Sequence, residues 1–176
     1  MRRPLTDRPI EGETFAYFGY GSNLLRSRLR ESCPSAILVT TARLPGYRLA
    51  FTRRSARWGG GVADIIEAPG SEVWGAVWDV PLAERAALDR QEGLHLDPPY
   101  YRRIEVAVTT PDGATLDCLA YQVATREAAH IAPSAAYLGT MLRGAAEVGL
   151  PGGMWSGWRG WRAVDGRMQT LNERMD

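Results

Sequence analysis

The sequence predicts a single α+β domain whose strands form a curled, mostly antiparallel sheet. Three observations lead to this fold class. Several short segments rich in aromatic and β-branched residues are separated by turn pairs, and about three further segments have helical patterns. The strands and helices do not alternate strictly, which argues against repeated parallel βαβ units. The length of 176 residues suits one domain with its own core.

The first strand is predicted at residues 15–18, where aromatic side chains suit a pleated, half-buried strand. Residues 19–21 are Gly-Tyr-Gly, and glycine permits positive φ or a close approach to a ligand. Residues 22–23, Ser-Asn, are favoured N-cap types for a short helix at residues 24–30. Because a helix start leaves backbone N–H groups unpaired, this segment predicts either an anion site or an ordinary strand-to-helix turn.

The next four strands are predicted as two pairs, and a Pro-Gly turn lies within each pair. The first pair is residues 36–44 and 47–51 around Pro45-Gly46. The second pair is residues 62–66 and 72–80 around Pro69-Gly70. In the last of these strands, one face is expected to be buried, and it carries Trp74, Ala76, Trp78 and Val80.

Three arginines, Arg53, Arg54 and Arg57, are predicted to lie in a polar loop after residue 51. They could bind a substrate carboxylate. The alternative is a solvated charged loop, which is the commoner role of such a cluster.

A helix is predicted at residues 82–92, because Pro81 suits a first helical turn and Gly93 suits a helix end. Glu92 therefore lies at a helix C-terminus, where the helix dipole disfavours negative charge. We expect the pKa of this carboxyl to be raised.

A loop with Pro98-Pro99 follows, and then a hairpin is predicted, with strands at residues 101–109 and 115–123 around a Pro-Asp-Gly turn. The clearest helix is capped by Ser134 and ends at residues 149–151. After it, Trp155, Trp158 and Trp161 are expected to pack over the domain. Residues 1–13 are predicted to be a polar extension, residues 14–165 the domain, and residues 166–176 a tail.

The composition limits the function classes. A net charge of +1, from 21 basic and 20 acidic residues, gives no general attraction to nucleic acid or an anionic membrane. Every basic residue is arginine, which excludes a Schiff-base or P-loop lysine. Cys33 and Cys118 lie far apart, and so do His95 and His130, so we expect no metal site and a reduced, cytoplasmic protein. No segment approaches the roughly 20 apolar residues of a membrane span.

Several segments together resemble the γ-glutamylcyclotransferases, the group that also includes AIG2-like and BtrG-like proteins. The resemblance covers residues 15–151. It depends on these segments in this order: Tyr20-Gly21-Ser22-Asn23-Leu24, Gly60-Gly61-Val62-Ala63, Pro69-Gly70-Ser71-Glu72-Val73-Trp74-Gly75, Leu88-Asp89-Arg90-Gln91-Glu92-Gly93, Tyr101, and Pro133-Ser134 with Tyr137. The resemblance implies a small mixed, mostly antiparallel β-barrel with helices packed around it.

The resemblance also implies a substrate site that needs no cofactor and no metal. The matched substrate-binding loop is Tyr20, Gly21, Ser22, Asn23 and Leu24, and the matched catalytic residue is Glu92. Tyr101 and Tyr137 match pocket-lining tyrosines, with core packing as an equal alternative. The region after Pro151 has no recognisable counterpart, which leaves the leaving group of the substrate open.

The implied activity is an amide-cleaving acyl transfer that closes a lactam, in a cytoplasmic enzyme linked to glutathione metabolism. The α-amine of a γ-glutamyl amino acid attacks the γ-carbonyl, and 5-oxoproline and the amino acid result. Glu92 would remove and return the proton. The alternatives are the same reaction on a γ-glutamyl amine or acyl biosynthetic intermediate, or a non-catalytic binding protein. The partner is then a small molecule, and a homodimer is left open.

Overall fold

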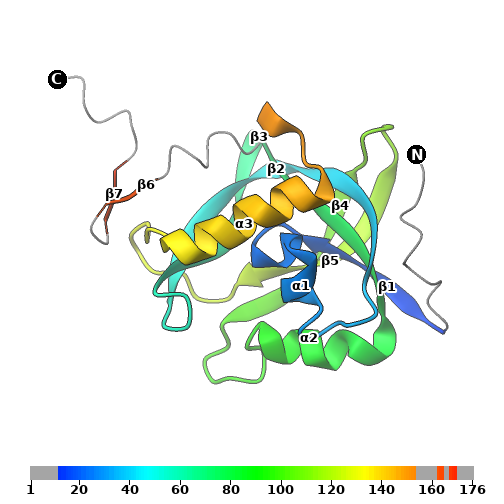
Figure 1. Ribbon diagram of the computed structural model, residues 1–176, viewed down its shortest axis with the longest axis horizontal. Helices are drawn as coiled ribbons and strands as arrows, with labels where there is room; N and C mark the ends of the chain where they lie inside the picture. Colours follow the sequence, from blue (N-terminus) through cyan, green and yellow to red (C-terminus); the bar gives the residue numbers. More distant parts are fainter. Residues whose placement is uncertain (1–11, 154–161, 165–166, 170–176) are drawn as a thin grey trace.

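The computed structural model describes residues 12–153, 162–164 and 167–169. Five strands form a closed barrel in the order β1-β3-β2-β4-β5. Neighbouring strands are antiparallel except β1 and β5, which pair in parallel at Tyr17 and Leu119. The expected mixed, mostly antiparallel barrel is therefore confirmed (Figure 1). The strands are β1 Thr14–Gly19, β2 Ile37–Ser55, β3 Gly60–Pro81, β4 Tyr101–Thr109 and β5 Thr115–Val123.

The prediction that each Pro-Gly pair ends one strand and begins another is wrong, because β2 and β3 each run through their Pro-Gly pair. The pairs lie opposite one another, since the ladder joins Pro45 to Glu72 and then Tyr47 to Glu67. Gly46 and Gly70 both have positive φ, 79° and 82°. Both strands therefore bulge at one level and continue, which bends the hairpin without ending it.

This continuation also moves two arginines that were predicted to lie in a loop. Arg53 and Arg54 belong to the end of β2, and only Arg57 lies in the turn between β2 and β3.

The first predicted helix is divided in two. A 3-10 turn, η1 (Ser22–Leu24), precedes α1 (Arg26–Leu29), because Leu25 between them is extended at φ −79° and ψ 118°. Ser22 and Asn23 lie inside η1, and neither caps a helix.

The other two predicted helices are confirmed with small changes. Pro81 ends β3, and a 3-10 turn, η2 (Leu82–Glu84), leads into α2 (Arg85–Gln91). Glu92 is the C-cap of α2, as expected. The Ser134 hydroxyl accepts a hydrogen bond from the Tyr137 amide at the start of α3 (Ala135–Val148), and the left-handed Gly149 ends that helix.

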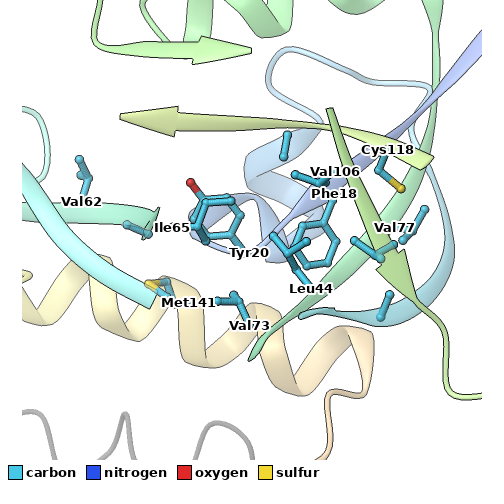
Figure 2. Packing of buried hydrophobic residues seen from close by; sticks show 14 of the residues in the cluster. Phe18, Tyr20, Leu44, Val62, Ile65, Val73, Val77, Val106, Cys118 and Met141 are labelled. Carbon is cyan, nitrogen blue, oxygen red and sulfur yellow. The ribbon is translucent and has the colours of Figure 1, made fainter. Parts of the chain in front are cut away.

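Two apolar cores lie on the two faces of the barrel wall. The first fills the barrel and reaches α3 through Tyr137 and Met141; Figure 2 shows Phe18, Val77 and Met141 within it. The second joins the outer wall to the helices and includes Trp78, Leu29 and Leu88. The face of β3 with Trp78 is buried as predicted, and the opposite face is buried too because it lines the barrel.

Residues 162–164 and 167–169 form a separate two-stranded antiparallel sheet, β6 (Arg162–Val164) with β7 (Arg167–Gln169). The three tail tryptophans, Trp155, Trp158 and Trp161, lie outside the described residues. Among the helices that the structure describes, none is long and apolar enough to cross a membrane.

Candidate active site

A cavity of about 140 Å³ lies where η1, the end of α2 and the first half of β3 meet. It collects residues from distant parts of the chain, and most of its wall is aromatic or polar. The lining residues are Tyr17, Tyr20, Gly21, Ser22, Asn23, Arg28, Arg53, Ser55, Arg57, Trp58, Val62, Ala63, Gln91, Glu92, Tyr100, Tyr101, Tyr121 and Tyr137. All but one of the predicted site residues are therefore brought together around one space.

Leu24 is the exception. Its side chain is fully buried in the core between the barrel and the helices, and it does not line the cavity. Its backbone N–H donates to the Gly21 carbonyl oxygen at 3.1 Å, so that amide is already used within η1.

Glu92 is placed by the end of α2. Its backbone N–H donates to the Leu88 carbonyl at 3.0 Å, and Gly93 then takes φ of 72°, which turns the chain away. Burial raises the pKa of the Glu92 carboxyl, while hydrogen bonds from Gln91 and Asn23 partly offset that rise. The expected direction of the pKa shift is confirmed, and removal from water is its main cause.

Asn23 connects the loop to this glutamate. Its side chain is 4% exposed, and its Nδ2 donates to Glu92 Oε1 and to the Tyr17 hydroxyl, both at 2.9 Å. Its Oδ1 accepts from Gln91 Nε2 at 2.9 Å, and Gln91 Oε1 accepts from Arg28 at 3.1 Å. Asn23 thus holds the carboxylate in place.

The three predicted tyrosines differ in what their hydroxyls do. The Tyr20 hydroxyl donates to the Tyr121 carbonyl, and the Tyr101 hydroxyl donates to the Ala63 carbonyl at 2.7 Å. The Tyr137 oxygen instead accepts from the Ala63 N–H at 3.1 Å, so its own hydrogen is not given to Ala63, and the backbone and side chain of Ser22 also hydrogen-bond with this hydroxyl. Burial raises the pKa of Tyr137 to about 12, so the hydroxyl stays protonated at neutral pH.

Gly21 lies in a closely packed part of the loop. A Cβ at this position would lie 3.0 Å from the Tyr137 hydroxyl oxygen and 3.1 Å from the Ala63 Cβ. The close approach predicted for this glycine is therefore to the protein's own α3 and β3, which brings Tyr137 against the loop.

Sequence reasoning missed several residues of this site. Tyr17, Arg28 and Gln91 hold Asn23 and Glu92, and the Ala63 backbone holds two tyrosines. Gln91, next to Glu92, was visible as part of the matched segment. A backbone role such as that of Ala63 leaves no signal in residue type.

These features define a class of protein, a closed β-barrel with a small, tyrosine-lined cavity that contains one buried carboxyl group. The model of the AIG2-like family matches residues 72–153. A γ-glutamylcyclotransferase of Bos taurus is 41% identical over 148 residues, which are 82% of this chain and 77% of that relative. A γ-glutamylcyclotransferase of Homo sapiens is 41% identical over 143 residues, 79% of this chain and 74% of that relative. The chain belongs to the γ-glutamylcyclotransferase family.

Solved structures agree with this family. A structure described as γ-glutamyl cyclotransferase matches with a TM-score of 0.82 and 35% identity, covering 92% of this chain and 95% of that one. YkqA from Bacillus subtilis matches with a TM-score of 0.66 and 29% identity, over 77% of this chain and 49% of that one. The resemblance inferred from the sequence is confirmed.

Proposed function

We propose that this protein is a γ-glutamylcyclotransferase that converts γ-glutamyl amino acids into 5-oxoproline and the free amino acid. The observation that carries the proposal is the buried Glu92 carboxylate facing a small cavity with the matched loop. Relatives in Bos taurus and Homo sapiens carry the same name at 41% identity.

The reaction needs no nucleophile from the protein. The α-amine nitrogen of the substrate forms a bond to the γ-carbonyl carbon, a five-membered lactam closes, and the original amide C–N bond breaks. One proton leaves the attacking nitrogen and one reaches the departing nitrogen, so the reaction balances. A cavity of about 140 Å³ supports a folded substrate, whose reacting atoms are then already close.

Glu92 suits both proton transfers. An ammonium cannot attack a carbonyl, so a base must first take its proton, and the resulting acid can then protonate the leaving nitrogen. A carboxyl whose pKa is raised by burial is a stronger base than a solvated one and a better-matched acid near neutral pH. Asn23 keeps this carboxylate turned to the cavity.

Tyr137 is our candidate for the donor that stabilises negative charge on the substrate, at the α-carboxylate or at the oxyanion of the tetrahedral intermediate. Its hydroxyl accepts from the Ala63 N–H and hydrogen-bonds with Ser22 of the matched loop, whereas the hydroxyl hydrogens of Tyr20 and Tyr101 are given to backbone carbonyls. The hydroxyls of Tyr20 and Tyr101 then mainly shape the wall.

The test is Glu92→Gln, which keeps the size of the side chain and an oxygen for Asn23. We expect 5-oxoproline release from γ-glutamyl-alanine to fall by about 10²- to 10⁴-fold, the usual contribution of acid–base catalysis. In the unaltered protein, kcat/KM should fall as the pH drops through the raised pKa of Glu92, because protonation removes the base.

Glu105→Gln is the matched control, because Glu105 is exposed on β4 outside the cavity. It should leave the rate unchanged. Full activity in a folded Glu92→Gln protein, checked by circular dichroism, would refute the assigned role.

We also infer a cytoplasmic location and a small-molecule partner rather than nucleic acid or membrane, in line with the near-neutral charge. A homodimer stays a prediction that sedimentation can examine.

A further inference from the structure

A second cavity, of about 490 Å³, adjoins the catalytic cavity and shares two of its wall residues, Arg53 and Tyr100. The lining residues of this outer cavity are Arg53, Arg54, Leu96, Asp97, Pro98, Pro99, Tyr100, Thr125 and Glu127. Because the inner cavity measures only about 140 Å³, the outer cavity offers space for a leaving group that extends past the shared pair.

Arg53 and Tyr100 form a stacked pair at this junction. The guanidinium carbon of Arg53 lies 3.4 Å from the centre of the Tyr100 ring, so the ring face holds the cation. Tyr100 comes from the loop that follows Glu92, and Arg53 comes from the end of β2.

The backbone fixes Tyr100 relative to Glu92. Its N–H donates to the Gly93 carbonyl at 3.1 Å, and its carbonyl accepts from the Ala124 N–H at 3.0 Å. A Cβ on Gly93 would lie 2.6 Å from the Tyr100 ring, so the ring packs directly on the backbone that follows Glu92. Arg53 is consequently held against Tyr100, in the wall of the cavity that Glu92 also lines.

Arg53 differs from the other two arginines of the inner cavity, because both of those form ion pairs with a carboxylate. Arg57 lies 3.2 Å from Glu31, and Arg28 pairs with the same carboxylate. Among the described residues, no carboxylate lies within ion-pair distance of Arg53. In the described part of the chain, Arg53 is therefore a cation without a carboxylate partner, in the wall that the two cavities share.

We propose that Arg53 selects γ-glutamyl donors whose leaving group carries a carboxylate, and so favours γ-glutamyl amino acids over γ-glutamyl amines. This inference rests on the proposed function. The guanidinium would donate to the carboxylate of the departing amino acid, and the side chain of that amino acid would extend into the outer cavity. A γ-glutamyl amine offers no anion at this position and loses that contact.

The experiment compares γ-glutamyl-alanine with γ-glutamyl-ethylamide, which differ only by the leaving-group carboxylate. We expect a higher kcat/KM for γ-glutamyl-alanine in the unaltered protein, and we expect Arg53→Gln to reduce this preference by about fivefold to tenfold, the effect of one half-exposed charge-assisted hydrogen bond. Arg48→Gln is the matched control, since Arg48 is an exposed arginine of the same strand outside both cavities.

An unchanged preference in folded Arg53→Gln overturns the inference. If Arg53→Gln does not fold, the salt dependence of the unaltered protein decides, because a preference that depends on an ion pair must fall as salt rises. If neither donor releases 5-oxoproline, the proposed function fails. The dissociation constants of the two donors, measured by calorimetry, then decide separately whether Arg53 selects the carboxylate.

Discussion

At the scale of single residues, the backbone of Ala63 organises the substrate side of the cavity. Its N–H is bound by Tyr137 and its carbonyl by Tyr101, so one peptide position in β3 fixes two rings from β4 and α3. The two bonds have opposite directions. Of these two tyrosines, only Tyr101 gives its hydroxyl hydrogen to Ala63, so the hydroxyl hydrogen of Tyr137 is not used in this pair of bonds.

This difference predicts unequal effects for the same substitution. Tyr137→Phe should lower kcat by about 10²-fold or more, the usual loss on removing a donor to developing negative charge. Tyr101→Phe is the matched control, because it also removes one bond to Ala63, and it should change kcat far less. Steady-state kinetics on γ-glutamyl-alanine measure both. Equal losses of kcat would mean that the two hydroxyls only support the fold.

At the scale of elements, α3 crosses the barrel and packs on the substrate loop (Figure 1). The contact is possible because Gly144 has no side chain. A Cβ there would lie 2.4 Å from the Leu25 backbone nitrogen and 2.6 Å from the Leu24 carbonyl carbon. The helix therefore sets the position of η1, and with it the position of Asn23.

Two glycines of α3 give a matched test. Gly139→Ala should raise the free energy of unfolding by about 0.5–1 kcal/mol, because its Cβ meets only the end of the Arg143 side chain, at 3.5 Å, and alanine favours helices. Gly144→Ala should lower it by about 1–3 kcal/mol through overpacking against backbone. Urea unfolding measures both.

Gly144→Ala should also lower activity, since a shifted loop misplaces Asn23 and Glu92. Unchanged stability and activity in that variant would show that α3 does not position the loop.

At the scale of the whole molecule, side chains join the first half of β3 to β5, which is not its neighbour in the barrel order. The described ladder pairs the first half of β3 only with β2. On the other edge, Asp64 accepts from the Val123 N–H of β5 at 3.0 Å, and Gln122 donates to the Ile65 carbonyl at 2.8 Å. Arg126 completes the link at 2.7 Å from Asp64. The cavity lies next to this gap in the ladder, where Ala63 can bind tyrosines.

Asp64 should therefore stabilise the entire barrel. It is 0% exposed, and Asp64→Ala leaves the buried Val123 N–H without its acceptor, which should cost about 1–3 kcal/mol of unfolding free energy. Asp117→Ala, at an exposed position of β5, should stay within about 0.5 kcal/mol of the unaltered protein. Denaturant unfolding followed by tryptophan fluorescence distinguishes the two. Equal midpoints would show that this link between β3 and β5 does not stabilise the fold.

The elements that the sequence determined are those with local signals. Ser134 and Gly149 mark the ends of α3, Gly93 leaves Glu92 at the end of α2, and the β4–β5 hairpin has the predicted limits. A cap or a hairpin turn depends on a few neighbouring residues, so it can be read from the chain.

Only the tertiary structure decided what each residue faces. It brought Asn23 to Glu92 and placed Leu24 in the core. It also let β2 and β3 continue through their Pro-Gly pairs, and it placed Arg53 on the Tyr100 ring between the two cavities. Asn23 and Glu92 are far apart in the chain, and so are Arg53 and Tyr100. The contacts within these two pairs depend on the path of the chain through the whole barrel, which the secondary-structure propensities of neighbouring residues do not determine.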